Sequence, residues 1–282
     1  MSTGNGEHTP GLARRGVLVV RNGLRSGRQD LLAEEVPLAI HLNGEPLAVM
    51  MVTPCDLEDF AYGFALTELG LPAGELTGVQ IQTLLEGLHA DIRTVSAERP
   101  PHQPEEPRWL PGRSGCGICG NRRLEDVIRQ PDAVRQGSAI APSTLDAALH
   151  AVAEHQPLNA ASGAVHAAAF VAPDGTVRLV REDVGRHNAL DKLIGALQRA
   201  EIVGGTGFVV VTSRASYEMV AKAAAAGVPL LAAMSAPTAL AVDLAQGCGV
   251  TLVGFARTGR HVVYSHPERL SAEGPTPAQL AK

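Results

Sequence analysis

Apolar and polar residues alternate in short runs over the first third of the chain, a pattern typical of β-strands. Asn43-Gly44 lies between two of these runs, and this dipeptide between two strands predicts a tight hairpin. The pattern over 57–69 is helical, and Asp56 is the expected N-cap of that helix. The predicted strands are 17–20, 37–42, 46–53, 79–85 and 89–95.

The second half of the chain has a different pattern, in which near-continuous apolar runs are separated by segments of helical length. A hairpin is predicted around Pro173-Asp174-Gly175, and Ser143 is the expected cap of a helix through His155. Apolar strands connected by helices predict an α/β fold with a mixed or parallel sheet flanked by helices. The remaining predicted strands are 167–171, 177–180, 208–212, 229–233 and 250–255, and the helices are 187–199, 217–226 and 238–245.

Changes in composition divide the chain into five segments. Residues 98–112 include five prolines, which exclude a regular element there. The predicted organisation is a disordered tail (1–15), a smaller β-rich N-terminal subdomain (16–98), a Pro-rich segment with a mobile loop (99–121), an α/β domain (122–270) that begins with a short helix over 122–129, and a flexible tail (271–282).

Length and charge narrow the class of protein. A chain of 282 residues, 45% of them hydrophobic, is long enough to bury a large core. A net charge of -5 excludes a general basic surface for nucleic acid or an acidic membrane. The sequence has neither a signal-peptide pattern nor the run of about 18 apolar residues that crosses a bilayer. We therefore expect a cytoplasmic protein with no nucleic-acid or membrane partner.

The stretch 112–120, GRSGCGICG, places Cys116 and Cys119 three residues apart among glycines. The other two cysteines, Cys55 and Cys248, stand alone in the sequence. Four cysteines are too few for a disulfide scaffold. In a reducing compartment, a Cys-x-x-Cys pair is typical of catalysis or metal binding.

Three chemistries are compatible with this pair. A structural zinc site needs four ligands, and the other cysteines provide no second pair. A redox pair of the thioredoxin type opens a helix after a strand, whereas a proline-rich segment precedes Cys116. A sulfur carrier needs a mobile loop and a thiolate, which the glycines and the nearby Arg113, Arg122 and Arg123 favour. The structural alternative, a tight turn with buried cysteines, is disfavoured by the same glycines and arginines.

The stretch 181–195, REDVGRHNALDKLIG, contains candidate acid–base groups. Asp183 is an expected cap of the following helix. His187 and Asp191 are spaced i,i+4, so that the carboxylate can orient the imidazole. An ordinary capped helix with surface ion pairs is the alternative interpretation.

Candidate anion-binding groups follow three predicted strands. Ser213, Arg214 and Ser216 in TSRASYE lie where a strand leads into a helix, and Ser235 in MSAPTA repeats the arrangement. Helix N-termini at the carboxyl ends of parallel strands bind phosphates. Two arginines in FARTGR (255–260) can bind a diphosphate through bidentate hydrogen bonds. A solvated turn also explains each motif taken singly.

Together, these motifs resemble a known family. The GCGICG loop, the EDVGRHNALDK run, the stretch from TSRASYE through MSAPTALAVDLA and the closing GFARTGR resemble the formate dehydrogenase accessory sulfurtransferases, the FdhD family, over about residues 17–266. Proteins of that family take sulfur from a cysteine desulfurase. They pass it to the molybdenum cofactor, bis-molybdopterin guanine dinucleotide, before this cofactor enters formate dehydrogenase. The resemblance therefore implies a sulfurtransferase with these partners.

The resemblance also implies a fold and residue roles. It implies a cytidine-deaminase-like core, generally in a homodimer, and we expect no permanently bound metal. Cys116 would hold the persulfide with Cys119 as its helper, and Asp183 is a candidate supporting polar group. The candidate cofactor-binding residues are Phe255, Ala256, Arg257, Thr258, Gly259 and Arg260, to which the strand-end motifs add Ser213, Arg214 and Ser235 and the stretch 181–195 adds His187.

Two rival functions are considered. The stretch 162–170, SGAVHAAAF, resembles the helix that carries His-Ala-Glu in zinc deaminases, but Ala168 stands in place of the glutamate. The Pro-Cys-x-x-Cys that should follow is also missing, so deamination is disfavoured and His166 is expected in the core or the cofactor pocket. The other rival is a non-catalytic chaperone that only binds and protects the cofactor.

Overall fold

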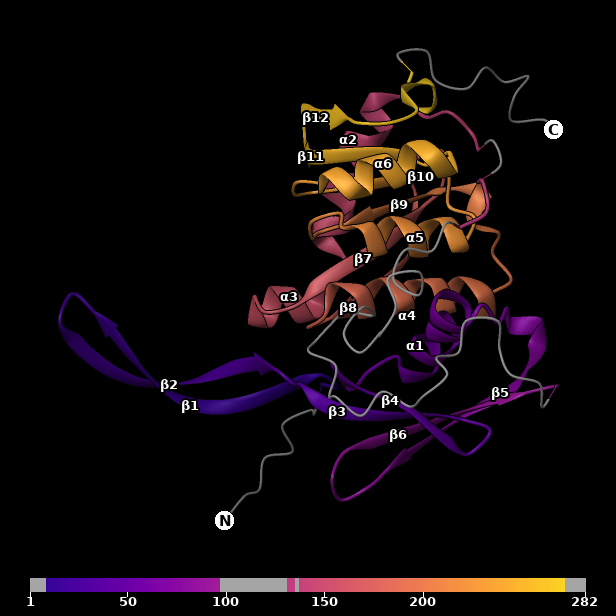
Figure 1. Cartoon of the computed structure of the whole chain (residues 1–282). Coiled ribbons are helices and arrows are strands. Elements are labelled where there is room, and N and C mark those ends of the chain that lie inside the picture. Colours follow the sequence, from indigo (N-terminus) through magenta and orange to yellow (C-terminus); the bar gives the residue numbers. More distant parts are fainter. Residues whose placement is uncertain (1–8, 97–130, 135–136, 272–282) are drawn as a thin grey trace.

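The computed structural model describes residues 9–96, 131–134 and 137–271. The described residues form a two-stranded, a four-stranded and a six-stranded sheet. Figure 1 shows the four-stranded sheet below the six-stranded sheet and its helices, with helix α1 (Leu57–Phe64) between them. The two-stranded sheet extends away from this body (Figure 1). The mixed α/β architecture and the β-rich N-terminal part predicted from the sequence are confirmed.

The four-stranded sheet has the strand order β4-β3-β6-β5. The predicted hairpin between β3 and β4 is confirmed, and Asn43 and Gly44 have φ values of 53° and 87°, as a two-residue turn of type I′ requires. One sheet face packs on α1 through Phe60 and Phe64, and α1 continues as a π-helical turn over Ala65–Leu69. The strands are β3 (Val36–Leu42), β4 (Glu45–Val52), β5 (Leu76–Thr83) and β6 (Leu88–Thr94).

The two-stranded sheet consists of β1 (Leu12–Arg21) and β2 (Leu24–Ala33), paired antiparallel along their whole length. The sequence pattern predicted a strand over 17–20 and placed residues 1–15 in a disordered tail. The strand begins earlier, at Leu12. Both faces of this ribbon are largely exposed, so its strands lack the alternation that burial of one face produces.

The six-stranded sheet has the order β12-β11-β10-β9-β7-β8. Strands β9, β10 and β11 are parallel, whereas β7 is antiparallel to β9 and to β8, and β12 is antiparallel to β11. The predicted hairpin of β7 and β8 is therefore confirmed. The strands are β7 (His166–Val171), β8 (Val177–Asp183), β9 (Phe208–Val211), β10 (Leu230–Ala233), β11 (Thr251–Arg257) and β12 (Arg260–Val263).

Helices cover both faces of the six-stranded sheet. Helices α4, α5 and α6 share one core with Val209 and Val211, and α2 packs against Phe208 and Val210 on the opposite face. These alternating valines and phenylalanine explain why β9 reads as continuously apolar. The helices are α2 (Pro142–Glu154), α3 (Pro157–Ser162), α4 (Arg186–Arg199), α5 (Tyr217–Ala225) and α6 (Ala239–Cys248). No helix in the described part of the chain is long and apolar enough to cross a membrane.

Helices α1 and α4 cross closely at two glycines. A Cβ atom on Gly63 would lie 1.8 Å from the carbonyl oxygen of Asp191, and one on Gly195 would lie 1.8 Å from that of Asp59. Only glycine permits so close a backbone approach. The Asp59 carboxylate also pairs with Arg181 of β8, with 2.7 Å between Oδ2 and Nη2. This crossing fixes the N-terminal sheet on the α/β part.

Several predicted local features differ in the structure. Asp56 occupies the N-cap position of α1, but it has a φ of 50° and makes no side-chain cap hydrogen bond. Helix α2 begins at Pro142, so Ser143 lies inside its first turn; proline suits this position because the first helical amides have no intrahelical partner. His166 begins a β-strand, although its stretch resembles a deaminase helix.

Candidate functional site

The loops that follow β9, β10 and β11 meet at one edge of the six-stranded sheet. The amide of Thr238 donates to the carbonyl of Ala215 at 3.0 Å, and the amide of Phe255 donates to the carbonyl of Ser235 at 3.1 Å. We call three segments the strand-end loops: residues 212–216, residues 234–238, and residues 255–260, which comprise the end of β11 and its turn into β12. Parallel strands bring their carboxyl ends to one edge, which is where ligands of open α/β sheets bind. The sequence motifs predicted to bind an anion are therefore brought together.

The first two strand-end loops offer polar groups beside helix N-termini. Ser213 is buried and donates its hydroxyl to the carbonyl of Arg214 at 3.0 Å, and Arg214 itself is exposed. Ser216 is the N-cap of α5 but makes no cap hydrogen bond. Ser235 is partly buried in the loop between β10 and α6. A helix start with hydroxyls and an arginine is suited to a phosphate.

Phe255 has a backbone conformation that is rare for a large side chain. Its φ is 51°, in the left-handed region, and 44% of the residue is exposed. The pairing of β11 with β12 is irregular between Gly254 and Arg257. An exposed aromatic ring in a strained position at a sheet irregularity is typical of a functional site.

The turn between β11 and β12 carries the two predicted arginines. Arg257 and Arg260 are paired across the turn and both are exposed, while Ala256 between Phe255 and Arg257 is completely buried. Thr258 is also exposed. Gly259 has a φ of 76°, and its amide donates to Oδ1 of Asp146 on α2 at 3.1 Å. The turn is thus anchored, and its guanidinium groups are available to an anion.

His187, in the first turn of α4, pairs with Glu218 of α5. Its Nε2 lies 2.8 Å from Oε2 of Glu218 and 3.4 Å from Oγ of Ser216. The predicted partner, Asp191, instead binds Lys222 at 2.9 Å and accepts from the Thr67 hydroxyl at 2.8 Å. The prediction of a His187–Asp191 pair is therefore wrong, because side chains four residues apart on α4 find nearer partners on other helices.

Lys222 is held in a buried ion pair. Burial lowers the pKa of Lys222, but the carboxylates of Asp191 and Glu68 outweigh this effect and raise it. Its Nζ lies 2.7 Å from Oε1 of Glu68. Lys222 and Asp191 therefore link α5, α4 and the turn after α1 as a structural unit, and Asp191 is not available to His187.

Four of the buried polar atoms without a partner among the described residues belong to His187, to its two sequence neighbours and to its partner Glu218. They are Nδ1 of His187, Oε1 of Glu218, Nε of Arg186 and Oδ1 of Asn188. Such atoms are uncommon in folded proteins, and those of the His187–Glu218 pair are typical of a site that binds a ligand or water. His166 lies near this group. Burial, followed by the charges of Arg186 and His187, lowers the pKa of His166 and favours its neutral form.

Asp183 is a structural anchor at the end of β8. Its Oδ2 accepts from the amide of Thr53 at 3.0 Å and from Nζ of Lys192 at 2.7 Å. Its Oδ1 accepts from the amide of Gly185 at 2.8 Å and from Nδ2 of Asn188 at 2.9 Å. Asp183 thus shapes the turn into α4, of which Gly185 is the N-cap. With both oxygens occupied, its role is to position α4 rather than to contact a substrate.

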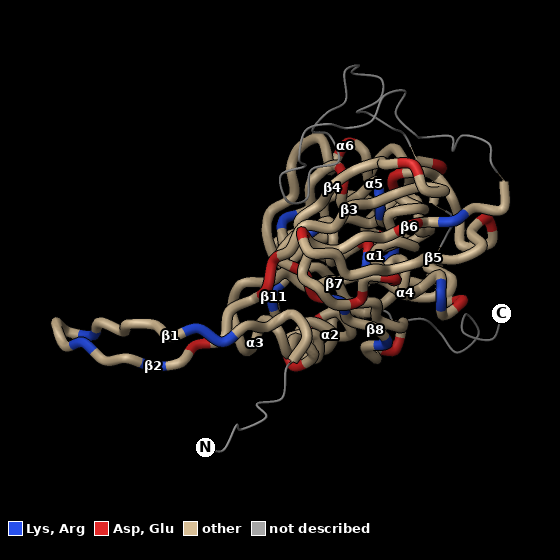
Figure 2. The backbone as a smooth tube through the Cα atoms, turned by 90° about the horizontal axis from the view of Figure 1, so that it is seen from below, with Lys and Arg blue, Asp and Glu red and all other residues tan. Residues whose placement is uncertain are grey.

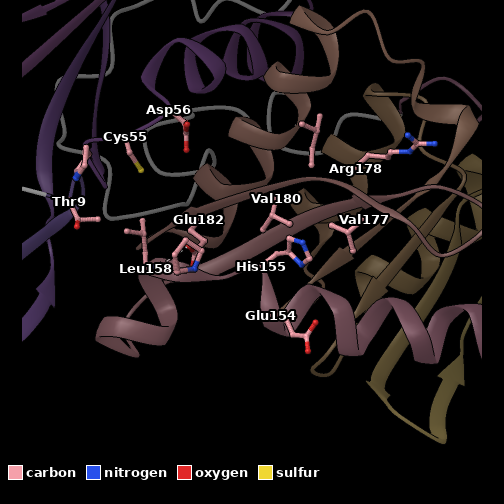
Figure 3. Close-up of a pocket in the computed structure, with 13 residues that line it drawn as sticks. Thr9, Cys55, Asp56, Glu154, His155, Leu158, Val177, Arg178, Val180 and Glu182 are labelled. Atoms are coloured by element: carbon pink, nitrogen blue, oxygen red, sulfur yellow. Dashed lines mark hydrogen bonds between the residues drawn. The ribbon is translucent and has the colours of Figure 1, made fainter. Parts of the chain in front are cut away.

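A separate pocket of about 670 Å³ lies beside Cys55. Figure 3 shows Thr9, Cys55 and Asp56 along one side and Glu154 and His155 along the other. Burial raises the pKa of Cys55 to about 11, although Lys192, with Nζ at 3.7 Å from Sγ, partly offsets this effect.

Burial also raises the pKa of Cys248, which is almost fully enclosed. Both described cysteines are therefore neutral thiols at pH 7. Cys116 and Cys119 lie outside the described residues, as do the predicted helix over 122–129 and the Pro-rich segment. Within the described ranges, no three His, Cys, Asp or Glu side chains are grouped to bind a metal ion.

Some of these groups were not identified from the sequence. Glu218 lies within a quoted motif, but nothing in that motif relates it to His187 on another helix. Asn188 and Arg186 lie beside His187 in sequence, and only the fold shows that each has a buried polar atom without a partner among the described residues. The positive φ of Phe255 also has no signal in the sequence.

Comparisons with known proteins give consistent results. The model of the FdhD/NarQ family matches residues 33–271. The chain is 53% identical over 263 residues to the sulfur carrier protein FdhD of Xanthomonas euvesicatoria, which covers 93% of each chain. It is 49% identical over 245 residues to the sulfur carrier protein FdhD of Cupriavidus necator, covering 86% of this chain and 85% of the relative.

A solved structure has a similar fold. The crystal structure of a candidate formate dehydrogenase accessory protein from Desulfotalea psychrophila superposes with a TM-score of 0.75 at 25% identity. The match covers 93% of this chain and 100% of the other.

Proposed function

Because the chain belongs to the FdhD/NarQ family, we propose that it is a sulfur carrier that serves the maturation of formate dehydrogenase. It accepts sulfur from a cysteine desulfurase on Cys116 and delivers it to bis-molybdopterin guanine dinucleotide, its substrate. The observation that carries the proposal is the meeting of the strand-end loops, where Arg257, Arg260 and the exposed Phe255 share one edge with two helix N-termini.

Thiol–persulfide exchange explains the loading of Cys116. Its thiolate attacks the terminal sulfur of the desulfurase persulfide, the sulfur–sulfur bond breaks, and the desulfurase thiolate leaves. No external oxidant is required. Cys55 and Cys248 are poor acceptors because burial raises the pKa of each thiol, and this supports the Cys116–Cys119 pair as the carrier.

The strand-end loops supply groups that suit a guanine dinucleotide. The guanidinium groups of Arg257 and Arg260 bind a diphosphate bidentately, with Arg214 and Ser235 as neighbouring donors, while Ser213 holds the loop through its bond to the Arg214 carbonyl. The ring of Phe255 offers a stacking surface to the guanine base. Held in this way, the cofactor meets the terminal sulfur in an oriented complex rather than by a chance encounter.

Two routes can complete delivery. In the first, reduced molybdenum of the substrate would supply the electron pair that binds the terminal sulfur, the sulfur–sulfur bond breaks, and the Cys116 thiolate leaves. In the second, the Cys119 thiolate attacks the inner sulfur, sulfide leaves, and the Cys116–Cys119 disulfide must then be reduced by a cellular thiol. His187, oriented by Glu218, is a supporting polar group in either route. We further propose that the protein acts in the cytoplasm as a homodimer.

Mass spectrometry after incubation with a cysteine desulfurase and cysteine tests the loading step. One added sulfur atom is expected on the Cys116 peptide, removable by mild reduction and absent in Cys116→Ala. No added sulfur on either cysteine would leave a cofactor-binding chaperone as the function. Full delivery by Cys119→Ala would eliminate the disulfide route.

Binding of guanosine diphosphate, used as a probe, tests the strand-end loops. Arg257→Ala combined with Arg260→Ala is expected to weaken binding at least about tenfold, because bidentate guanidinium contacts are lost. Arg178→Ala, an exposed arginine on β8 that lines the Cys55 pocket, is the matched control and should bind like the wild type. Equal binding by all three proteins would place the nucleotide elsewhere.

A further inference from the structure

The two-stranded sheet, residues Leu12–Ala33, is here called the arm. It belongs to neither of the other sheets. Ten residues of each strand are paired, from Leu12 with Ala33 to Arg21 with Leu24, which gives a ribbon about 33 Å long at about 3.3 Å per residue. Both Figure 1 and Figure 2 show it extending away from the body. An isolated two-stranded ribbon is marginally stable in water, so a structural role for the arm requires a partner surface.

One face of the arm carries apolar side chains at its base and again near its tip, and the body covers only those at the base. Directly paired residues share a face, and Leu12, Leu31 and Ala33 pack at the base with Leu158 and Val165 of the body.

Farther along the same face, Leu18 and Val20 are 62% and 61% exposed. Gly27, opposite Leu18, leaves open space beside it, which would let another backbone approach closely. Apolar side chains like those that the body covers at the base thus recur uncovered toward the tip, beyond the polar Gln29 and beside Arg25.

The charge of the arm indicates which surface can cover it. It contains five arginines, at positions 14, 15, 21, 25 and 28, and one acidic residue, Asp30. The whole chain has 24 basic and 29 acidic residues, so the part outside the arm has 19 basic and 28 acidic residues. A basic arm and an acidic remainder on the same chain are complementary between two copies. Two arms repel each other, which disfavours arm–arm pairing.

We propose that the arm docks on the body of a second copy of this chain, with Leu18 and Val20 covered at the contact and the arginines facing acidic side chains. In a two-fold dimer each copy then provides one arm and one receiving body. The proposal rests on the homodimer that the proposed function includes, and it adds which surface forms the contact between the two copies. Sulfur loading of Cys116 is a separate property.

Analytical ultracentrifugation of the full chain tests the contact. Leu18→Asp combined with Val20→Asp is expected to raise the dimer dissociation constant at least about tenfold, since each change places a charge in an apolar contact. Leu85→Asp combined with Val203→Asp is the matched control, because both residues are exposed and lie outside the arm. The control should remain as dimeric as the wild type. A wild-type monomer, a dimeric arm variant or a monomeric control would overturn the proposal.

Cross-linking identifies the receiving surface. A photoreactive benzoylphenylalanine at position 18, in a mixture of light and ¹⁵N-labelled chains, is expected to join the arm of one copy to residues outside the arm of the other. Cross-links between two arms, or only within one copy, would refute it. Raising the salt from about 50 to about 500 mM should weaken the dimer, because a contact between opposite charges is screened.

The sulfur assay is run on the same variants and separates the two proposals. Loading of Cys116 in a monomeric arm variant is the expected result. Absence of sulfur on Cys116 in the wild type would contradict the proposed sulfur-carrier function and would leave the result for the arm unchanged.

Discussion

At the scale of single residues, the pKa of Cys55 distinguishes a structural thiol from a carrier. The raised pKa of about 11 predicts that iodoacetamide at pH 8 labels Cys55 about 100-fold more slowly in the folded protein than in urea, because only the thiolate reacts. Peptide mass spectrometry measures the two rates, and Cys55→Ser identifies the peptide. Fast labelling in the folded state would make Cys55 a candidate carrier beside Cys116.

The same pKa predicts a dependence of stability on pH. The folded-state pKa lies above the ordinary value, so the folded protein holds this proton more tightly than the unfolded chain. The stabilisation is complete below the ordinary thiol pKa and is lost as the pH rises through about 11. Denaturant unfolding of the wild type and Cys55→Ala between pH 8 and pH 11 should therefore converge. A constant difference in the free energy of unfolding would contradict the shift.

The candidate site could be predicted from sequence only where chemistry is local. Arg257 and Arg260 were identified because a guanidinium group keeps its charge in any exposed turn. The partner of His187 was predicted on its own helix as Asp191, and the structure places it on α5 as Glu218. Helical spacing describes neighbours along one helix, whereas packing between helices decides which neighbour is closer.

At the scale of elements, the crossing of α1 and α4 depends on two glycines. Gly195→Ala is expected to lower the free energy of unfolding by at least about 2 kcal/mol, because the new methyl group meets the backbone of α1 and the helices must separate. Gly247→Ala, inside α6 with open space around it, should instead stabilise by about 0.5–1 kcal/mol. Chemical denaturation measures both, and stabilisation by both variants would show that helix propensity, not packing, decides.

Most elements were predictable, whereas their ends and the arm were less so. Strands β9 and β10 are buried on both faces, so continuous apolar residues identified them. The arm has no buried face over most of its length, so its sequence lacks a regular alternation of apolar and polar residues. Arg14 and Arg15 therefore gave no indication that β1 begins at Leu12. Helix α2 begins at Pro142 and has no side-chain cap. The preference of serine for N-cap positions therefore predicts its start too late, with Ser143 as the cap.

At the scale of the whole molecule, Asp183 and Lys192 join the N-terminal sheet to the six-stranded sheet. Lys192 is completely buried, donates to the carbonyl of Thr53 at 3.0 Å and to that of Glu182 at 3.2 Å, and pairs with Asp183. Thr53 follows β4 directly, so the ion pair holds the end of one sheet against the end of the other. Asp183 and Thr53 are 130 residues apart in sequence, so local sequence patterns could not predict their contact.

Asp183→Asn should therefore weaken the whole structure rather than one loop. It keeps the shape of the side chain but leaves the Lys192 charge buried without a counter-charge, which is expected to cost about 3–5 kcal/mol. Asp174→Asn, in an exposed turn where the carboxylate accepts from the Thr176 amide, is the control and should change stability by about 1 kcal/mol or less.

Hydrogen exchange shows where the Asp183→Asn effect appears. Because the pair connects the two sheets, amides of β3 and β4 should lose more protection than those of β9 and β10, which are buried inside the six-stranded sheet. Lys192→Met combined with Asp183→Asn removes both charges and should recover part of the lost stability, since an uncharged pair leaves no buried charge without a counter-charge. Two results would show that Asp183 acts through its hydrogen bonds to α4 and not through the junction. One is an equal loss of protection in both sheets. The other is a double variant that loses more stability than the two single variants added together.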